Sequence, residues 1–133
     1  MIIVYSYYVL DIIHKGHLEM LRNAKAVAGP DGRLIVGILT DEACCEKKPA
    51  PVMSFEERVE LARSIECVDL VVTQDTYSPL SNIKSIKPDI LMESSSHEPD
   101  PDVISAMNML GGRILCIPYF PDHSSTKIKE QIR

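Results

Sequence analysis

Two histidines and a glycine lie within four residues of one another near the start of the chain, at His14, Gly16 and His17. Glycine has no side chain, so a phosphate can approach the backbone at Gly16 closely. His17 lies where we expect a helix to begin, and free N–H groups and the positive end of the helix dipole attract anions there. The two imidazole rings add hydrogen-bond donors. This combination predicts a site that stabilises a phosphoryl group during its displacement.

Segments typical of strands and of helices alternate along the chain and must position these residues. The first apolar segment is rich in β-branched and aromatic residues, and the histidines follow it directly. Such alternation indicates an α/β fold: a Rossmann-like, doubly wound sheet of about five parallel strands with helices on both faces. Ligands bind beyond the carboxyl ends of such strands. We expect strands at residues 2–10, 34–39, 70–73, 89–92 and 113–117, and helices at 17–27, 54–66, 78–86, 103–110 and 125–132.

Local signals mark where several of these elements begin and end. Ser54 and Glu57 have the spacing of a capping box, which predicts that a helix begins after Ser54. Gly111 follows a helical segment and is expected to stop it. Residues 41–52 are rich in Lys and Pro and are expected to form a polar loop. Residues 98–102 alternate acidic residues with proline, which predicts a rigid, solvated acidic loop.

The composition is that of a single globular domain covering residues 1–133. Of the 133 residues, 45% are apolar and 25% charged, and the net charge is −5. No basic cluster is longer than Lys47-Lys48, so neither nucleic acid nor a membrane is an expected partner. No apolar run approaches about 18 residues and no basic region begins the chain, so we expect a cytoplasmic location. The four cysteines form no C-x-x-C pair and are expected to be reduced thiols.

Motifs along nearly the whole chain resemble those of the H-x-G-H nucleotidyltransferase superfamily. Within it, the chain is most similar to the cytidylyltransferase group typified by glycerol-3-phosphate cytidylyltransferase. His14-Lys15-Gly16-His17 matches the superfamily signature. Ser124-Ser125-Thr126-Lys127-Ile128-Lys129 resembles the C-terminal signature S-[ST]-T-x-I-[KR]. Weaker matches lie between these two motifs, at residues 36–42, Lys47, residues 54–58 and Val68-Asp69.

The resemblance implies an activity and a set of site residues. The activity is transfer of CMP from CTP, accompanied by Mg²⁺, to a small phosphonate or phosphate acceptor, with release of pyrophosphate. His14 and His17 would hold the α-phosphate and Lys47 the outer phosphates, and these three are the implied catalytic residues. No carboxylate cage for the metal is evident, and family members are commonly homodimers. The implied nucleotide-binding residues are Tyr8, Val9, Leu10, Gly16, Glu93, His123, Ser124, Ser125, Thr126 and Lys127.

Three positions depart from the motifs of the family. Tyr8 replaces the glycine of G-x-F-D, Glu93 replaces the glycine of G-D-D, and Tyr119 replaces the arginine of R-x-x-G-I-S-T-T. These changes argue against glycerol-3-phosphate as the acceptor. The chain is closest in style to the cytidylyltransferase domain found with phosphoenolpyruvate phosphomutase in fosfomycin-type phosphonate biosynthesis. That similarity implies an acceptor like 2-hydroxyethylphosphonate, and it is compatible with a domain taken from a longer bifunctional chain that carries a fused phosphomutase domain.

Two other functions are compatible with the same residues. Ser124-Ser125-Thr126 also suits an adenylyltransferase of the superfamily. The departures at Tyr8, Glu93 and Tyr119 also suit a nucleotide-binding module that has lost catalytic activity. Outside the motifs, Asp11 is expected to cap the turn after the first strand. Arg58 is expected to lie in a salt bridge on the surface of a helix.

Overall fold

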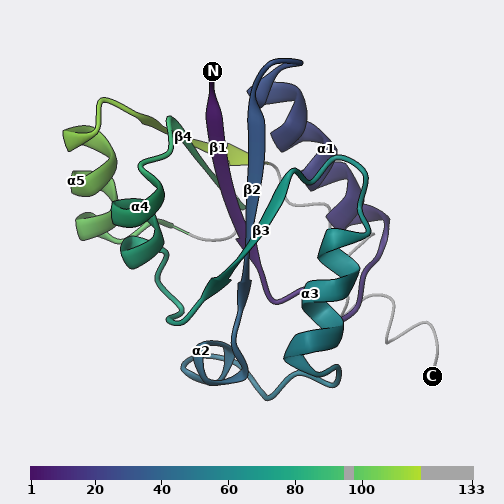
Figure 1. The fold of residues 1–133 in the computed structure, drawn as a ribbon. Coiled ribbons are helices and arrows are strands. Elements are labelled where there is room, and N and C mark those ends of the chain that lie inside the picture. The colour runs from purple at the N-terminus through teal and green to yellow at the C-terminus, as the bar shows by residue number, and fades with distance from the viewer. Residues whose placement is uncertain (95–97, 118–133) are drawn as a thin grey trace.

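A computed structural model describes residues 1–94 and 98–117, and its centre is a sheet of parallel strands (Figure 1). The order of the strands across the sheet is β3-β2-β1-β4-β5. The chain therefore runs to one edge and then returns past β1 to the other, as a doubly wound sheet requires. The predicted α/β fold is confirmed. The strands are β1 (Ile3–Tyr8), β2 (Arg33–Leu39), β3 (Leu70–Gln74), β4 (Ile90–Ser94) and β5 (Arg113–Ile117).

Helices cover both faces of the sheet, with α1 (Lys15–Ala28) and α3 (Phe55–Arg63) on one side and α4 (Leu80–Ile86) and α5 (Pro101–Met109) on the other (Figure 1). The residues of β1 show how both faces are buried. Val4 belongs to the core cluster beneath α1 and α3, and the next residue, Tyr5, belongs to the cluster beneath α4 and α5. Successive strand residues point to opposite faces, so one strand supplies both cores.

A short helix, α2 (Asp41–Cys45), occupies the start of the segment predicted to be a loop. The Thr40 hydroxyl accepts a hydrogen bond from the Ala43 N–H at 3.0 Å and caps this helix. The negative charges of Asp41 and Glu42 in the first turn interact favourably with the helix dipole, and Ala43 and Cys44 are buried. The loop prediction was therefore wrong for residues 41–45, because a cap and two buried residues stabilise a turn too short to show a helical period.

The predicted boundaries of the other helices are close to those observed. Ser54 and Glu57 form the expected capping box at the start of α3. α1 begins at Lys15, two residues earlier than predicted, because His14 caps it. α5 begins at Pro101 within the predicted acidic loop, and Gly111 follows it with φ 71°. The predicted helix at 125–132 lies outside the described residues. No helix in the described part of the chain is long and apolar enough to cross a membrane.

Candidate active site

His14 and His17 lie against each other at the first turn of α1. The Nδ1 atom of His14 accepts a hydrogen bond from the Gly16 N–H at 3.0 Å. The Nδ1 atom of His17 accepts one from the His14 N–H at 3.3 Å. This reciprocal arrangement satisfies two backbone donors that a helix start leaves without a partner, as a capping box does with Ser and Glu. The centroids of the two rings are 4.1 Å apart.

These hydrogen bonds fix the tautomer of each neutral ring. A neutral imidazole has one donor nitrogen and one acceptor nitrogen. Because Nδ1 accepts in both His14 and His17, the proton of each neutral ring is on Nε2. Burial lowers the pKa of His17 from 6.5 to about 4, and the positive charges of His14 and Lys48 act in the same direction. His17 is therefore a neutral Nε2–H donor near pH 7.

The first turn of α1 also differs from the first turns of the two helices that follow it. Asp41 and Glu42 occupy the first turn of α2, and Glu56 and Glu57 occupy that of α3. In the first turn of α1, all of which the structure describes, there is no acidic side chain. No acidic side chain of this first turn thus offsets the positive end of the helix dipole, and an anion there would be stabilised. Free N–H groups were expected at this helix start, but the Gly16 N–H donates a hydrogen bond to His14.

The end of β1 and the residues that follow it lead into the histidine pair. The ring of Tyr8 meets that of His17 edge to face, with centroids 6.4 Å apart and an interplanar angle of 85°. The Tyr8 hydroxyl accepts a hydrogen bond from Ser6. Leu10 is only 1% exposed and has φ 60°, a left-handed conformation that is costly for leucine. Its side chain packs in the core, so only its backbone is available to a ligand.

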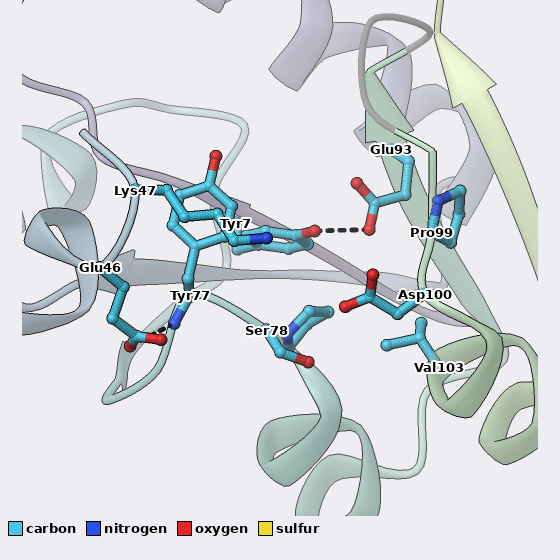
Figure 2. A pocket seen from close by; sticks show the side chains of 10 residues that line it. Tyr7, Glu46, Lys47, Tyr77, Ser78, Glu93, Pro99, Asp100 and Val103 are labelled. Atoms are coloured by element: carbon cyan, nitrogen blue, oxygen red, sulfur yellow. Dashed lines mark hydrogen bonds between the residues drawn. The ribbon is translucent and has the colours of Figure 1, made fainter.

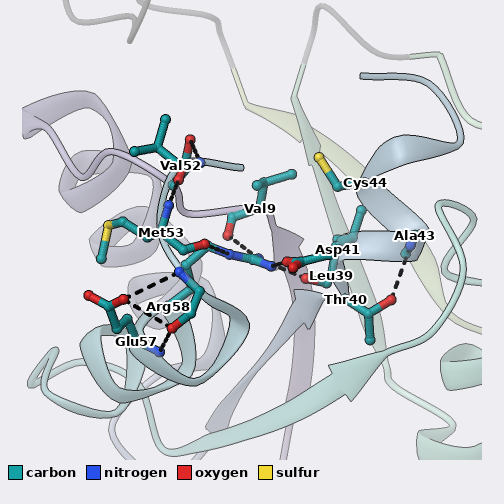
Figure 3. Close-up of polar contacts among 12 residues, drawn as sticks. Val9, Leu39, Thr40, Asp41, Ala43, Cys44, Val52, Met53, Glu57 and Arg58 are labelled. Carbon is teal, nitrogen blue, oxygen red and sulfur yellow. Dashed lines mark hydrogen bonds and ion pairs between the residues drawn. The ribbon is translucent and has the colours of Figure 1, made fainter. Parts of the chain in front are cut away.

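Arg58 joins the carboxyl ends of β1 and β2 (Figure 3). Its guanidinium donates to the Val9 carbonyl at 2.8 Å and to the Leu39 carbonyl at 2.7 Å. It also donates to Asp41 at 2.6 Å, so the predicted salt bridge is confirmed. The predicted surface position was wrong, because Arg58 is 0% exposed. Its partners come from separate strand ends, which no pattern within α3 reveals.

Asp11 anchors the loop that precedes α3. Its two carboxylate oxygens accept hydrogen bonds from the Val52 N–H at 3.0 Å and the Met53 N–H at 2.8 Å. The Met53 carbonyl in turn accepts a hydrogen bond from Arg58 at 3.4 Å. Asp11 and Arg58 thus hold the segment between β1 and α1 against α3. Asp11 was expected to cap the turn after the first strand, whereas these hydrogen bonds join it to backbone N–H groups 41 and 42 positions further along the chain.

A pocket of about 180 Å³ lies beyond the carboxyl ends of β1 and β4 (Figure 2). Tyr7 and Glu93 form its floor, and the Tyr7 hydroxyl donates to the Glu93 carboxylate at 2.6 Å. Burial raises the pKa of Glu93 from 4.5 to about 7, the charge of Asp100 acts in the same direction, and the hydrogen bond from Tyr7 opposes both. The other lining residues are Glu46, Lys47, Tyr77, Ser78, Pro79, Pro99, Asp100 and Val103.

The structure divides the predicted site residues between two places. His14, Gly16, His17 and Tyr8 gather at α1, whereas Lys47 and Glu93 line the pocket. Lys47 is exposed, and its ammonium lies 5.1 Å from the centroid of the Tyr77 ring. The Val9 carbonyl is engaged by Arg58. The remaining predicted residues, His123, Ser124, Ser125, Thr126 and Lys127, lie outside the described residues, as does Tyr119.

Several residues at these two places were not predicted from the sequence. Tyr7 and Tyr77 line the pocket, and Lys48 acts electrostatically on His17. The pair Lys47-Lys48 stood out as a basic cluster, which was a usable signal for Lys48. Within residues 1–94 and 98–117, no group of three or more His, Cys, Asp or Glu side chains is placed to ligate a metal.

A family profile described as cytidylyltransferase-like matches residues 9–131. Among curated relatives, the bifunctional protein HldE of Alcanivorax borkumensis is 33% identical over 98% of this chain, which spans only 28% of the length of that relative. The FAD synthase of Korarchaeum cryptofilum is 30% identical over 92% of this chain and 85% of its own length.

A solved structure has the same fold. It is the lipopolysaccharide core biosynthesis protein from Thermoplasma volcanium GSS1, with a TM-score of 0.74 and 24% sequence identity. The match covers 90% of this chain and 97% of that chain. At this identity the likeness supports the fold described above.

Proposed function

The chain belongs to the cytidylyltransferase-like family of nucleotidyltransferases, and on this premise we propose that it transfers CMP from CTP to a small phosphonate or phosphate acceptor. The observation that carries the proposal is the pair of imidazoles at the start of α1. Each has its Nδ1 occupied by a backbone N–H, so the neutral ring carries its proton on Nε2, from which it can donate to a phosphate oxygen. Two Nε2–H donors at a helix start with no acidic side chain in its first turn suit an anionic phosphoryl group.

The chemistry of the step fits this arrangement. An oxygen of the acceptor's phosphonate or phosphate attacks the α-phosphorus of the nucleotide in line, and a new P–O bond forms. The bond from the α-phosphorus to the bridging oxygen breaks, and pyrophosphate leaves with the electron pair. The attacking oxygen is already anionic near pH 7, so no general base is needed. His14 and His17 then serve as hydrogen-bond donors that stabilise charge on the α-phosphate in the transition state.

Other assignments follow from the family resemblance. Lys47 is proposed to bind the outer phosphates, and Ser125, Thr126 and Lys127 are proposed to share that task. Mg²⁺ would enter as the counter-ion of the triphosphate. The homodimer, the cytoplasmic location and a fused phosphoenolpyruvate phosphomutase domain stay predictions from the sequence. The expectation of 2-hydroxyethylphosphonate as acceptor is likewise a proposal, and none of the relatives described above bears on a phosphonate.

Adenylyl transfer is the second candidate, and a specific relative favours it. The FAD synthase of Korarchaeum cryptofilum is matched over most of both chains. Synthesis of FAD joins an adenylyl group to a phosphorylated acceptor, which is the same type of displacement with ATP in place of CTP. The family description supports CTP, and this relative supports ATP.

Pyrophosphate release separates these candidates. The full chain is incubated with each of the four nucleoside triphosphates, Mg²⁺ and a panel of phosphonates and phosphate esters. We expect release with CTP, and release with ATP alone would assign adenylyl transfer instead. Nucleotide binding by calorimetry without pyrophosphate from any pair would overturn catalysis and indicate a binding module. Lys84→Ala, a change of an exposed cation on α4 that lies outside both places, is the control expected to retain full activity.

A further inference from the structure

The pocket shown in Figure 2 and the histidine pair lie on either side of the carboxyl end of β1. Successive residues of a strand point to opposite faces. Tyr8 meets the ring of His17, and its neighbour Tyr7 lines the pocket. β1 and β4 are adjacent strands between which the winding of the sheet reverses, and ligands of such sheets bind in the crevice at this point. A molecule in the pocket is therefore next to the proposed reaction centre.

The size of the pocket limits what part of a substrate it takes. Its volume of about 180 Å³ equals roughly six water molecules at about 30 Å³ each. Pockets for larger organic ligands usually measure about 300–1,000 Å³. The space suits the end of a small molecule with a few non-hydrogen atoms, and a whole nucleotide would extend beyond it. Of the two substrates of the proposed reaction, the acceptor is the one that fits.

The walls of the pocket favour a positive charge. Three carboxylates line it, from Glu46, Glu93 and Asp100, against the single ammonium of Lys47. The ring of Tyr77 forms another wall, and the Lys47 ammonium already lies 5.1 Å from its centroid. Carboxylates together with the face of an aromatic ring are the chemistry that binds ammonium groups.

Glu93 is the strongest single indication. It is 4% exposed, and among the described residues its carboxylate receives one hydrogen bond, from Tyr7, and forms no ion pair. A buried carboxylate without a cation is unfavourable, and a bound cation would supply the missing partner. The raised pKa of Glu93 agrees with this, because burial without a nearby cation disfavours the ionised carboxylate. The motif that the chain resembles has glycine at this position, so the carboxylate of Glu93 departs from that motif.

We infer that this pocket binds the ammonium end of an aminoalkyl phosphonate or aminoalkyl phosphate acceptor, held by Glu93, Asp100 and the ring of Tyr77. The anionic end of the acceptor then faces the end of β1, where the imidazoles hold the nucleotide. This inference rests on the proposed function and names its substrate class. It replaces the hydroxyl of the expected acceptor with an amine, because a hydroxyl would leave Glu93 without a counter-charge.

A matched pair of acceptors tests the inference. 2-Aminoethylphosphonate and 2-hydroxyethylphosphonate differ only in the terminal group, and phosphoethanolamine carries the same amine on a phosphate ester. We expect kcat/KM for 2-aminoethylphosphonate to exceed that for the hydroxyl analogue at least ~100-fold, because the analogue leaves buried polar groups unpaired. Equal or higher kcat/KM for the hydroxyl analogue would overturn the inference. Comparison with phosphoethanolamine distinguishes a phosphonate from a phosphate acceptor.

Charge-removing variants locate the effect in the pocket. Glu93→Gln keeps the shape of the side chain and is expected to raise KM for the amine about 30-fold, with KM for the nucleotide unchanged. Asp100→Asn, at an exposed position that carries little folding risk, is expected to raise it about 5-fold. Glu56→Gln, an exposed change of the same charge on α3, is the control and should change neither value. An unchanged preference for the amine in Glu93→Gln would contradict the inference.

A binding measurement separates failure of this inference from failure of the proposed function. If no acceptor yields pyrophosphate, the proposed function is wrong. Calorimetry of 2-aminoethylphosphonate with the full chain then still tests the pocket. Binding that Glu93→Gln weakens at least tenfold would support the ammonium site, and absence of binding to the unmodified chain would overturn it.

Discussion

The two sides of the carboxyl end of β1 are built in different ways. On the side of α1, His14 and His17 hold each other through backbone N–H groups, and burial keeps His17 neutral. On the opposite side, Tyr7 and Glu93 form the floor of a pocket in which burial favours the protonated carboxyl. One side presents imidazole donors whose Nδ1 atoms are held by the backbone, and the other presents a carboxyl group whose charge depends on what binds.

This difference assigns the reaction to one side of the strand end and the recognition of the acceptor to the other. The histidine pair is arranged within four consecutive residues, so the same local sequence can form it in any member of the family. The pocket is assembled from β1, β4, and the segments that follow α2 and β3 and begin α5. Changes at one position there alter the pocket without disturbing the histidines. We therefore expect substitutions on the α1 side to change turnover, and substitutions in the pocket to change the choice of acceptor.

The largest expected effect is that of His17→Ala. It removes one donor to the transition state, and such a loss costs about 100- to 1,000-fold in kcat. Nucleotide affinity should change less than about threefold, because the donor acts most strongly on charge that develops during the reaction. Single-turnover rates and calorimetric Kd values measure the two separately. Equal losses in rate and in affinity would make His17 a ground-state binding residue. The two sides would then no longer differ in acting on turnover and on substrate binding.

Arg58→Met is expected to have the next largest effect, on stability. It leaves the Val9 and Leu39 carbonyls without their buried donor, which should lower the free energy of unfolding by about 3–4 kcal/mol. The ion pair with Asp41 adds little, because 59% of that side chain is exposed. Urea unfolding measures the change. Arg63→Met, at an exposed position on the same helix, is the control. A similar loss of stability in both variants would contradict a stabilising role for the hydrogen bonds that Arg58 donates to the two strand ends.

Arg58 also illustrates where prediction from the sequence ends. The order of strands and helices, the capping box at Ser54 and the site at His14 and His17 follow from short-range patterns, and the structure agrees with the first two. The buried position of Arg58 depends on carbonyls from two strand ends, and the pocket depends on residues up to 96 positions apart, from Tyr7 to Val103. Only tertiary folding brings such groups together.

The two sides should respond to pH in opposite directions. The pKa of Glu93 is raised to about 7, so its contribution to stability is full below about pH 4.5 and is lost as the pH rises through 7. The pKa of His17 is lowered to about 4, so its contribution is full above about pH 6.5 and is lost as the pH falls through 4. Each change should amount to about 3 kcal/mol.

Variants measured across this range reveal the two contributions. Relative to the unmodified chain, Glu93→Gln should gain stability as the pH rises from 5 to about 8, because its side chain cannot ionise. His17→Asn should gain relative stability as the pH falls from 7 to about 4, for the same reason. Chemical unfolding at each pH gives the values. Parallel pH profiles for both variants would contradict the opposite environments of the two sides.

The smallest expected effect compares two tyrosines on one strand. Tyr7→Phe removes the hydrogen bond to Glu93 and should raise KM for an amine acceptor about three- to tenfold with kcat unchanged. Tyr8→Phe keeps the ring that meets His17 and loses only the hydroxyl bonded to Ser6, so KM for the acceptor should not change. Steady-state kinetics with 2-aminoethylphosphonate distinguishes them. An equal rise in both variants would mean that the hydroxyl of Tyr7 has no particular role.

The most direct measurement is a crystal structure of the full chain with a nonhydrolysable CTP analogue, and a second with the ATP counterpart. The account predicts that the Nε2 atoms of His14 and His17 both lie about 2.6–3.2 Å from oxygens of the α-phosphate, with the pocket at Glu93 left for the acceptor. An α-phosphate bound away from both rings, or a nucleotide base seated in that pocket, would contradict it.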